Sequence, residues 1–238
     1  MVHEALGHGT AAWLTGDPIL SISTVALQNE RANRFVSAAG TLANCGVGAC
    51  ALLLFRRARK LTPVAYFLWL LGAFNLLNCG YLVVSAILNN GDWANVIAGL
   101  APPRLWRCLL ALTGATLYVA FVRWISSALV RMLGSEASAQ DSWRLVLPAY
   151  LAGGAVMTLA SVFNPISPSL ILLSGAGASF GLNAGLLFIP AIVERREGGE
   201  PAIGATGTLP FSLLWVVLGL VSGGVFIAVL GPGIQFAH

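Results

Sequence analysis

Four long stretches of the chain carry no charged residue. They run from Arg34 to Arg56, from Lys60 to Asp92, from Arg144 to Glu194 and from Pro201 to His238. Each is long enough for one or two apolar helices of about 20 residues, the length that crosses a bilayer. Only 9% of the 238 residues are charged, against about a quarter in a soluble domain, and the mean hydropathy is +0.82. The sequence therefore predicts an all-α polytopic membrane protein.

The apolar pattern divides into about seven helical segments. We expect them at residues 2–14, 35–55, 62–89, 105–133, 143–163, 169–193 and 210–230. The first would rise only about 20 Å, less than a hydrocarbon core of about 30 Å. It is therefore either a re-entrant segment or preceded by further apolar residues before Met1, and we favour the second interpretation. Residues 19–28 are rich in β-branched side chains in rough alternation, which favours a small β-hairpin at the membrane surface.

The third segment is too long for a straight crossing. Asn75, Asn78 and Gly80 lie near its centre. Amide side chains and a glycine at that depth are tolerated where they face protein or a cavity, so we expect a tilt or a break there. The two amides are then expected to face the functional site.

Small residues recur at steps of four in the second and the last segments. They are Gly40, Asn44 and Gly48 in the second segment and Gly219 and Gly223 in the last. Such stripes let two helix backbones approach closely in a membrane. We therefore expect both stripes to be faces on which another helix packs.

The charged residues lie mainly between the apolar segments. Nine basic residues fall on one side of the predicted membrane and four on the other. The positive-inside rule then places the loop from Arg56 to Lys60 in the cytoplasm. Because the basic residues are topology signals of this kind, the net charge of +4 indicates no nucleic-acid partner.

The first eight residues hold two of the three histidines and a glutamate. An ionisable side chain at the centre of a membrane helix costs about 2.5 to 3.5 kcal/mol, so such residues usually mark a functional site. His3, Glu4 and His8 are the residue types with which helical zinc proteases present two imidazoles and a general base. We therefore interpret His3 and His8 as ligands of a Zn²⁺ ion and Glu4 as the catalytic residue.

The spacing is His-Glu-x-x-x-His, one residue longer than the usual motif. Positions five apart point about 140° apart on an α-helix. Two imidazoles on one metal ion therefore require a widened π-turn, for which Gly7 is a permissive residue. A regular α-helix would instead place Glu4 and His8 on one face as a carboxylate and imidazole pair, with His3 elsewhere.

A catalytic zinc site needs a third protein ligand and an open position. Asp92 is the leading candidate for that ligand, with Asp17, Asn75 and Asn78 behind it. The alternative role for Asp92 is that of a turn residue that caps a helix after Gly91. Candidates for binding the substrate backbone or an oxyanion are Asn44, Asn75 and Asn78, and for each of them an interhelical hydrogen bond is the alternative.

The first 95 residues or so resemble the site-2-protease-type intramembrane zinc metalloproteases. The resemblance lies in the string from His3 to His8 followed by residues 10–16, in the β-like stretch, in residues 39–44 and in residues 75–77. It implies that the two histidines bind zinc, that the glutamate activates water, and that an aspartate from the third core helix completes the site, for which Asp92 stands in. The longer spacing also resembles that of the modulator-of-gyrase-type metalloproteases.

On this resemblance, residues 1–95 are the metal-binding core and residues 96–238 are additional transmembrane helices of the same membrane domain. It implies a zinc-dependent endopeptidase whose partners are the lipid bilayer and a transmembrane protein substrate, in a multi-pass protein of the bacterial inner membrane. A non-catalytic protein of the same fold, which binds a metal or a partner helix, is the second hypothesis. The third is a proton-coupled transporter in which His3, Glu4 and His8 relay protons.

Overall fold

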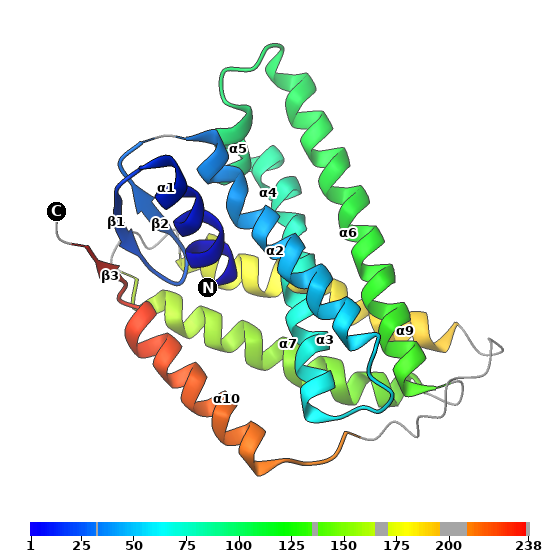
Figure 1. The fold of residues 1–238 in the computed structure, drawn as a ribbon. Helices are drawn as coiled ribbons and strands as arrows, with labels where there is room; N and C mark the ends of the chain where they lie inside the picture. Colours follow the sequence, from blue (N-terminus) through cyan, green and yellow to red (C-terminus); the bar gives the residue numbers. More distant parts are fainter. Residues whose placement is uncertain (32, 135–137, 165–170, 196–208, 237–238) are drawn as a thin grey trace.

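The structure, a computed structural model, describes residues 1–31, 33–134, 138–164, 171–195 and 209–236. This part of the chain is mostly helical and carries one small antiparallel sheet (Figure 1). The helical elements are η1 Val2–Gly9, α1 Thr10–Thr15, α2 Arg34–Phe55, α3 Pro63–Leu77, η2 Asn78–Gly80, α4 Tyr81–Leu88, α5 Asp92–Ile97, α6 Pro103–Leu133, α7 Ala139–Val162, η3 Ile171–Leu182, η4 Ala184–Phe188, α9 Ile189–Glu194, α10 Leu213–Val225 and η5 Phe226–Leu230. The strands are β1 Ile19–Ile22, β2 Leu27–Asn29 and β3 Ile234–Gln235.

Six helical stretches of the described residues are long and apolar enough to cross a membrane. They are Arg34–Phe55, Pro63–Leu88, Pro103–Leu133, Ala139–Val162, Gly175–Glu194 and Leu213–Leu230. They correspond to the second to seventh predicted segments. The first predicted segment forms the shorter pair η1 and α1, which ends before the αL residue Gly16. The predicted fold class is confirmed.

The third predicted segment is broken where its amides lie. Thr62 caps α3 by accepting a hydrogen bond from the Ala65 N–H, and Pro63 opens the helix. A short 3₁₀ turn, η2, then separates α3 from α4. This confirms the predicted break. Tyr81 is the first residue of α4, and the 3₁₀ turn changes the direction in which the side chains of α4 point relative to those of α3.

The main buried core lies where α2, α3, α6, α7 and the segment from η4 to α9 pack together. Trp69 is completely buried there, and its indole N–H donates to the Ile125 carbonyl over 3.2 Å. A Cβ built on Gly48 of α2 would lie 2.8 Å from Cγ of Leu76 on α3. The first small-residue stripe is therefore a close-packing face, as predicted.

The small sheet has the strand order β2-β1-β3. The hairpin of β1 and β2 is antiparallel, with Ile22 opposite Leu27, and confirms the predicted hairpin. The third strand was not predicted. It pairs antiparallel with the other edge of β1, with Ser21 opposite Gln235, and so joins the end of the described chain to its beginning.

The second small-residue stripe does not pack as predicted. Helix α10 runs beside α7 (Figure 1), yet none of its residues is buried. A Cβ built on Gly219 would have no neighbouring atom within 4 Å, and one on Gly223 would reach only Val156, at 3.8 Å. Both glycines instead line a cavity that separates this part of α10 from the rest of the helices. The cavity is the reason why the packing prediction fails here.

Candidate metal centre

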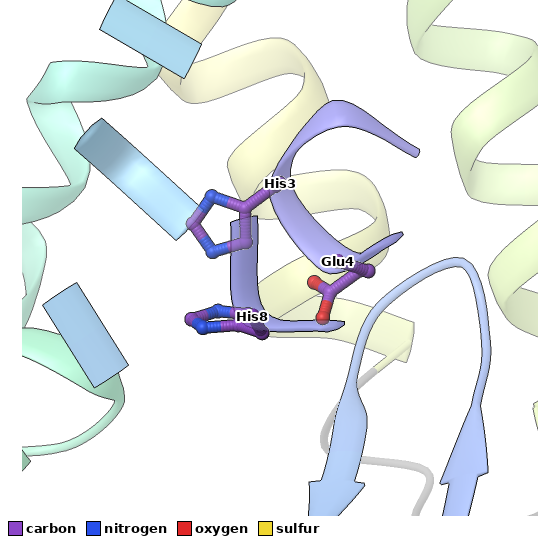
Figure 2. Close-up of side chains that lie close together, drawn as sticks. All are labelled: His3, Glu4 and His8. Atoms are coloured by element: carbon purple, nitrogen blue, oxygen red, sulfur yellow. The ribbon is translucent and has the colours of Figure 1, made fainter. Parts of the chain in front are cut away.

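The segment that carries the two histidines is a π-helix, η1. The wider turn brings His3 and His8 to the same side, with ring centroids 4.7 Å apart and ring planes at 84°. One ligand atom from each of His3, Glu4 and His8 lies within 4.8 Å of the others. Figure 2 shows the three side chains close together on this one short helix. The predicted widened turn is confirmed, and the group is a candidate metal site.

Gly7 has a different role from the one predicted. A Cβ built on Gly7 would lie 2.5 Å from Cα of Gly40 on α2, so glycine is needed because η1 and α2 are in backbone contact. Gly40 is equally restricted, because a Cβ there would lie 2.6 Å from Nε2 of both His3 and His8. The Nε2 atoms of the two imidazoles therefore converge over the backbone of α2 at Gly40, where no side chain lies between them and the helix.

Asp92 lies at the same point. Its Oδ2 atom is 3.1 Å from His3 Nε2 and 3.4 Å from His8 Nε2. Ligand atoms about 2.0 to 2.2 Å from one tetrahedral zinc ion are about 3.3 to 3.6 Å apart, so these separations are close to those of a zinc site. The donor set and the space above Gly40 thus fit a metal ion.

The short helix α5 brings Asp92 to the histidines. Gly91 precedes it, and the Asp92 side chain does not cap it. Two hydrogen bonds hold α5 against α2. The Trp93 indole N–H donates to Thr41 Oγ1 over 2.9 Å, and Arg34 Nη2 donates to the Ala98 carbonyl over 2.5 Å. The alternative role of Asp92 as a helix cap is therefore not observed.

Each imidazole is held by a hydrogen bond at Nδ1. His8 Nδ1 lies 2.7 Å from the Val36 carbonyl, which only accepts, so Nδ1 carries the proton and Nε2 faces Asp92. His3 Nδ1 lies 3.2 Å from Nδ2 of Asn44. Turning the Asn44 amide over places Oδ1 there, accepting from Nδ1–H and leaving the His3 Nε2 lone pair for a metal.

His8 and Asp92 form an ion pair across the site, with His8 Nε2 3.4 Å from Asp92 Oδ2. Both lie outside the six membrane-length helices. Burial alone would lower the pKa of His8, but the hydrogen bond to Asp92 and the charge of Glu4 outweigh it and raise that pKa to about 9. Burial disfavours the Asp92 carboxylate, yet its hydrogen bonds to His3 and His8 hold its pKa well below the usual value. A metal ion that binds here must therefore displace a proton.

Replacing Asn44 by Leu is expected to weaken metal binding. The substitution keeps the branched shape of the side chain but removes the polar group that fixes the His3 ring, and loss of such a partner costs about 10 to 100-fold in metal affinity. Titration of the purified protein with zinc against a competing chelator measures the effect. Asn75→Leu is the matched control, because the Asn75 amide donates to the Leu71 carbonyl and not to an imidazole. Equal affinities of the two variants would contradict this role of Asn44.

A cavity of about 970 Å³ adjoins the candidate metal site. Its walls come from η1, the hairpin, α2, the broken helix α3–η2–α4, α5, α7, η3, α10 and η5. All three predicted amides line it, although Asn44 is engaged with His3. Asn78 Oδ1 is buried and has no hydrogen-bond partner among the described residues. The amides of the broken third segment therefore face the site, as predicted.

Two further residues of this cavity were missed from the sequence. Asn183 donates to the Ser179 carbonyl, and Tyr81 packs edge-on against the His3 ring at 6.3 Å between centroids. The position of Tyr81 directly after the predicted break could have indicated from the sequence that this side chain lies in the cavity. Asp17, a lesser candidate for the third ligand, accepts hydrogen bonds from the Asn29 side chain and the Arg31 N–H, and so supports the hairpin.

Neither the family models, nor the curated proteins, nor the solved structures with which the chain was compared give a match. What the chain shows is a set of membrane-length helices with an N-terminal His3, Glu4 and His8 cluster that can hold a metal ion.

Proposed function

We propose that this chain is a zinc-dependent intramembrane endopeptidase that cleaves a transmembrane segment of a protein substrate. The observation that carries the proposal is the convergence of the His3 and His8 Nε2 atoms on Asp92 Oδ2, at 3.1 and 3.4 Å, beside the buried Glu4. Such a set has the ligands and the acid–base group that metal-assisted hydrolysis requires.

His3, His8 and Asp92 are the residues that would hold the zinc ion. Three protein ligands leave a fourth position open, which distinguishes catalytic from structural zinc sites. A bound zinc ion supplies a Lewis acid and lowers the pKa of a coordinated water to about 7. The hydrogen bonds of Val36 and Asn44 to the two imidazoles keep both Nε2 atoms directed at that ion.

Glu4 is the general base and acid. Glu4 belongs to the same widened turn as His3 and His8, and it is only 8% exposed. In the proposed reaction Glu4 accepts a proton from water as the water oxygen bonds to the peptide carbonyl carbon. It then delivers this proton to the leaving nitrogen as the C–N bond breaks. The products are a carboxylic acid and an amine, so that one water is consumed for each bond cleaved.

The cavity supports a substrate that is apolar and locally unwound. Phe67, Leu70 and Phe74 of α3 contribute apolar wall, and Asn75 and Asn78 contribute amides. In a helix each backbone carbonyl accepts a hydrogen bond from the N–H group four residues later in the chain. A peptide bond therefore becomes accessible to attack only after that helical turn has opened. The amides of Asn75 and Asn78 are suited to replace the lost hydrogen bonds of the opened turn.

We place the protein in the bacterial inner membrane, with the Arg56 to Lys60 loop in the cytoplasm.

Removal of the metal tests this function directly. Protein reconstituted in liposomes with a single-span model substrate, which carries helix-breaking residues at its centre, is expected to cleave it. Treatment with a strong chelator is expected to stop cleavage, and one equivalent of zinc to restore it. Chelator already saturated with zinc is the control for effects on the bilayer. Undiminished cleavage by protein shown to be metal-free would refute a metallopeptidase.

A further inference from the structure

Tyr81 is a residue of the metal-site cavity to which no role has yet been given. It opens α4 directly after the 3₁₀ turn that breaks the third segment. Its ring lies edge-on to His3, with ring planes at 89°. A continuous α-helix would carry the side chain of residue 81 in another direction, so the break itself directs this tyrosine toward the site.

The hydroxyl of Tyr81 lies against the residues that deliver Asp92. A Cβ built on Gly91 would collide with Tyr81 Oη, so the hydroxyl occupies the space that a larger residue would need. Gly91 also has φ +84°, a conformation that glycine adopts readily. The hydroxyl therefore lies next to Gly91, the residue that precedes Asp92. One side chain thus lies against both a histidine of the site and the backbone that leads into Asp92.

We propose that Tyr81 is a positioning residue that holds Asp92 in reach of His3 and His8. The proposal rests on the metal site of the proposed function. Helix α5 has only six residues, and its side-chain hydrogen bonds, from Trp93 and Arg34, join it to α2. Leu82 and Ala86 of α4 pack against Trp93 and Ile97, whereas the Tyr81 hydroxyl is the α4 contact that lies next to Asp92. Because ligands must be held within about 0.5 Å of their productive positions, loss of this contact lets Asp92 withdraw.

The test measures cobalt binding, which needs no cleavage. In the full chain in detergent, Tyr81→Phe removes the hydroxyl and keeps the ring, and is expected to weaken Co²⁺ binding about tenfold. The absorption spectrum of the bound Co²⁺ is expected to change as the carboxylate ligand is lost. Tyr118→Phe is the matched control, because it removes the same group from a tyrosine whose hydroxyl donates to the Leu182 carbonyl, away from the metal site. It should leave the affinity and the spectrum unchanged.

A double-mutant cycle shows whether Tyr81 acts through Asp92. In an Asp92→Asn background, Tyr81→Phe is expected to cause no further loss of affinity, because the ligand that it positions is already gone. An equal loss in both backgrounds would mean a general structural effect and would overturn the proposal. An unchanged affinity in the single variant would also overturn it.

The outcome is separable from that of the proposed peptidase activity. If the wild-type chain binds Co²⁺ but cleaves nothing, the peptidase function fails, while the affinities still decide the role of Tyr81. If the wild-type chain binds no Co²⁺ at all, the proposed role of Tyr81 fails together with the metal site. Thermal unfolding of each metal-free variant confirms that the proteins compared are folded.

Discussion

Glu4→Gln is expected to reduce cleavage by about 10²- to 10⁴-fold, the usual contribution of a general acid–base group. The amide has nearly the same shape as the carboxylate but accepts no proton at neutral pH. Water activation and protonation of the leaving nitrogen are therefore both lost. Metal binding should persist, because His3, His8 and Asp92 are unchanged. The expected signature is thus a protein that retains zinc and has lost its activity.

The measurement is the rate of cleavage in liposomes together with the zinc content of the same preparation. Glu30→Gln is the matched control, since Glu30 is an exposed acid at the end of the hairpin. An unchanged rate in Glu4→Gln would exclude Glu4 as the base. Zinc binding without cleavage, even in the wild-type chain, would instead favour a non-catalytic protein that uses the same site.

Gly40→Ala is expected to eliminate metal binding although it adds only one methyl group. That methyl would lie 2.6 Å from Nε2 of both His3 and His8, where the metal-facing atoms converge. One of the two rings must then turn away, or η1 must move off α2. Either movement removes at least one ligand, and a site with two protein ligands no longer has the set that catalytic zinc requires. Activity should be lost along with the metal.

Gly46→Ala provides the control on the same helix. A Cβ built on Gly46 has no neighbouring atom within 4 Å, and both substitutions gain the same helix propensity of about 1 kcal/mol. Zinc content by mass spectrometry is expected to fall to background in Gly40→Ala and to remain at the wild-type level in Gly46→Ala. Full zinc occupancy in Gly40→Ala would show that the zinc ion binds elsewhere.

The helices and the widened turn were predictable because both follow from local sequence. Charge-free stretches indicate most of the membrane-length helices, although Pro103–Leu133 carries four arginines, and the amides of residues 75 and 78 mark the break in the third predicted segment. The π-turn follows from requiring His3 and His8 to share one ion. Chemistry at one site can therefore predict backbone geometry, where hydrophobic periodicity alone would have predicted a regular α-helix.

The remainder depends on contacts between distant residues, which no local pattern encodes. Gly7 was interpreted as a backbone feature of the turn, but it is required by Gly40, 33 positions along the chain. The stripe of Gly219 and Gly223 has the same spacing as that of Gly40 and Gly48, yet it faces a cavity. Spacing shows that close approach is permitted, and only the tertiary arrangement decides whether it occurs.

The third strand of the sheet has a consequence for biosynthesis. Strand β1 precedes the six membrane-length helices of the described residues, whereas its partner β3 follows them. During translation, one edge of β1 must therefore stay unpaired until all six have been made, and pairing of such sequence-distant segments is intrinsically slow. Because the same hairpin lines the cavity, a growing chain would keep that wall incomplete until the sixth of these helices has been inserted.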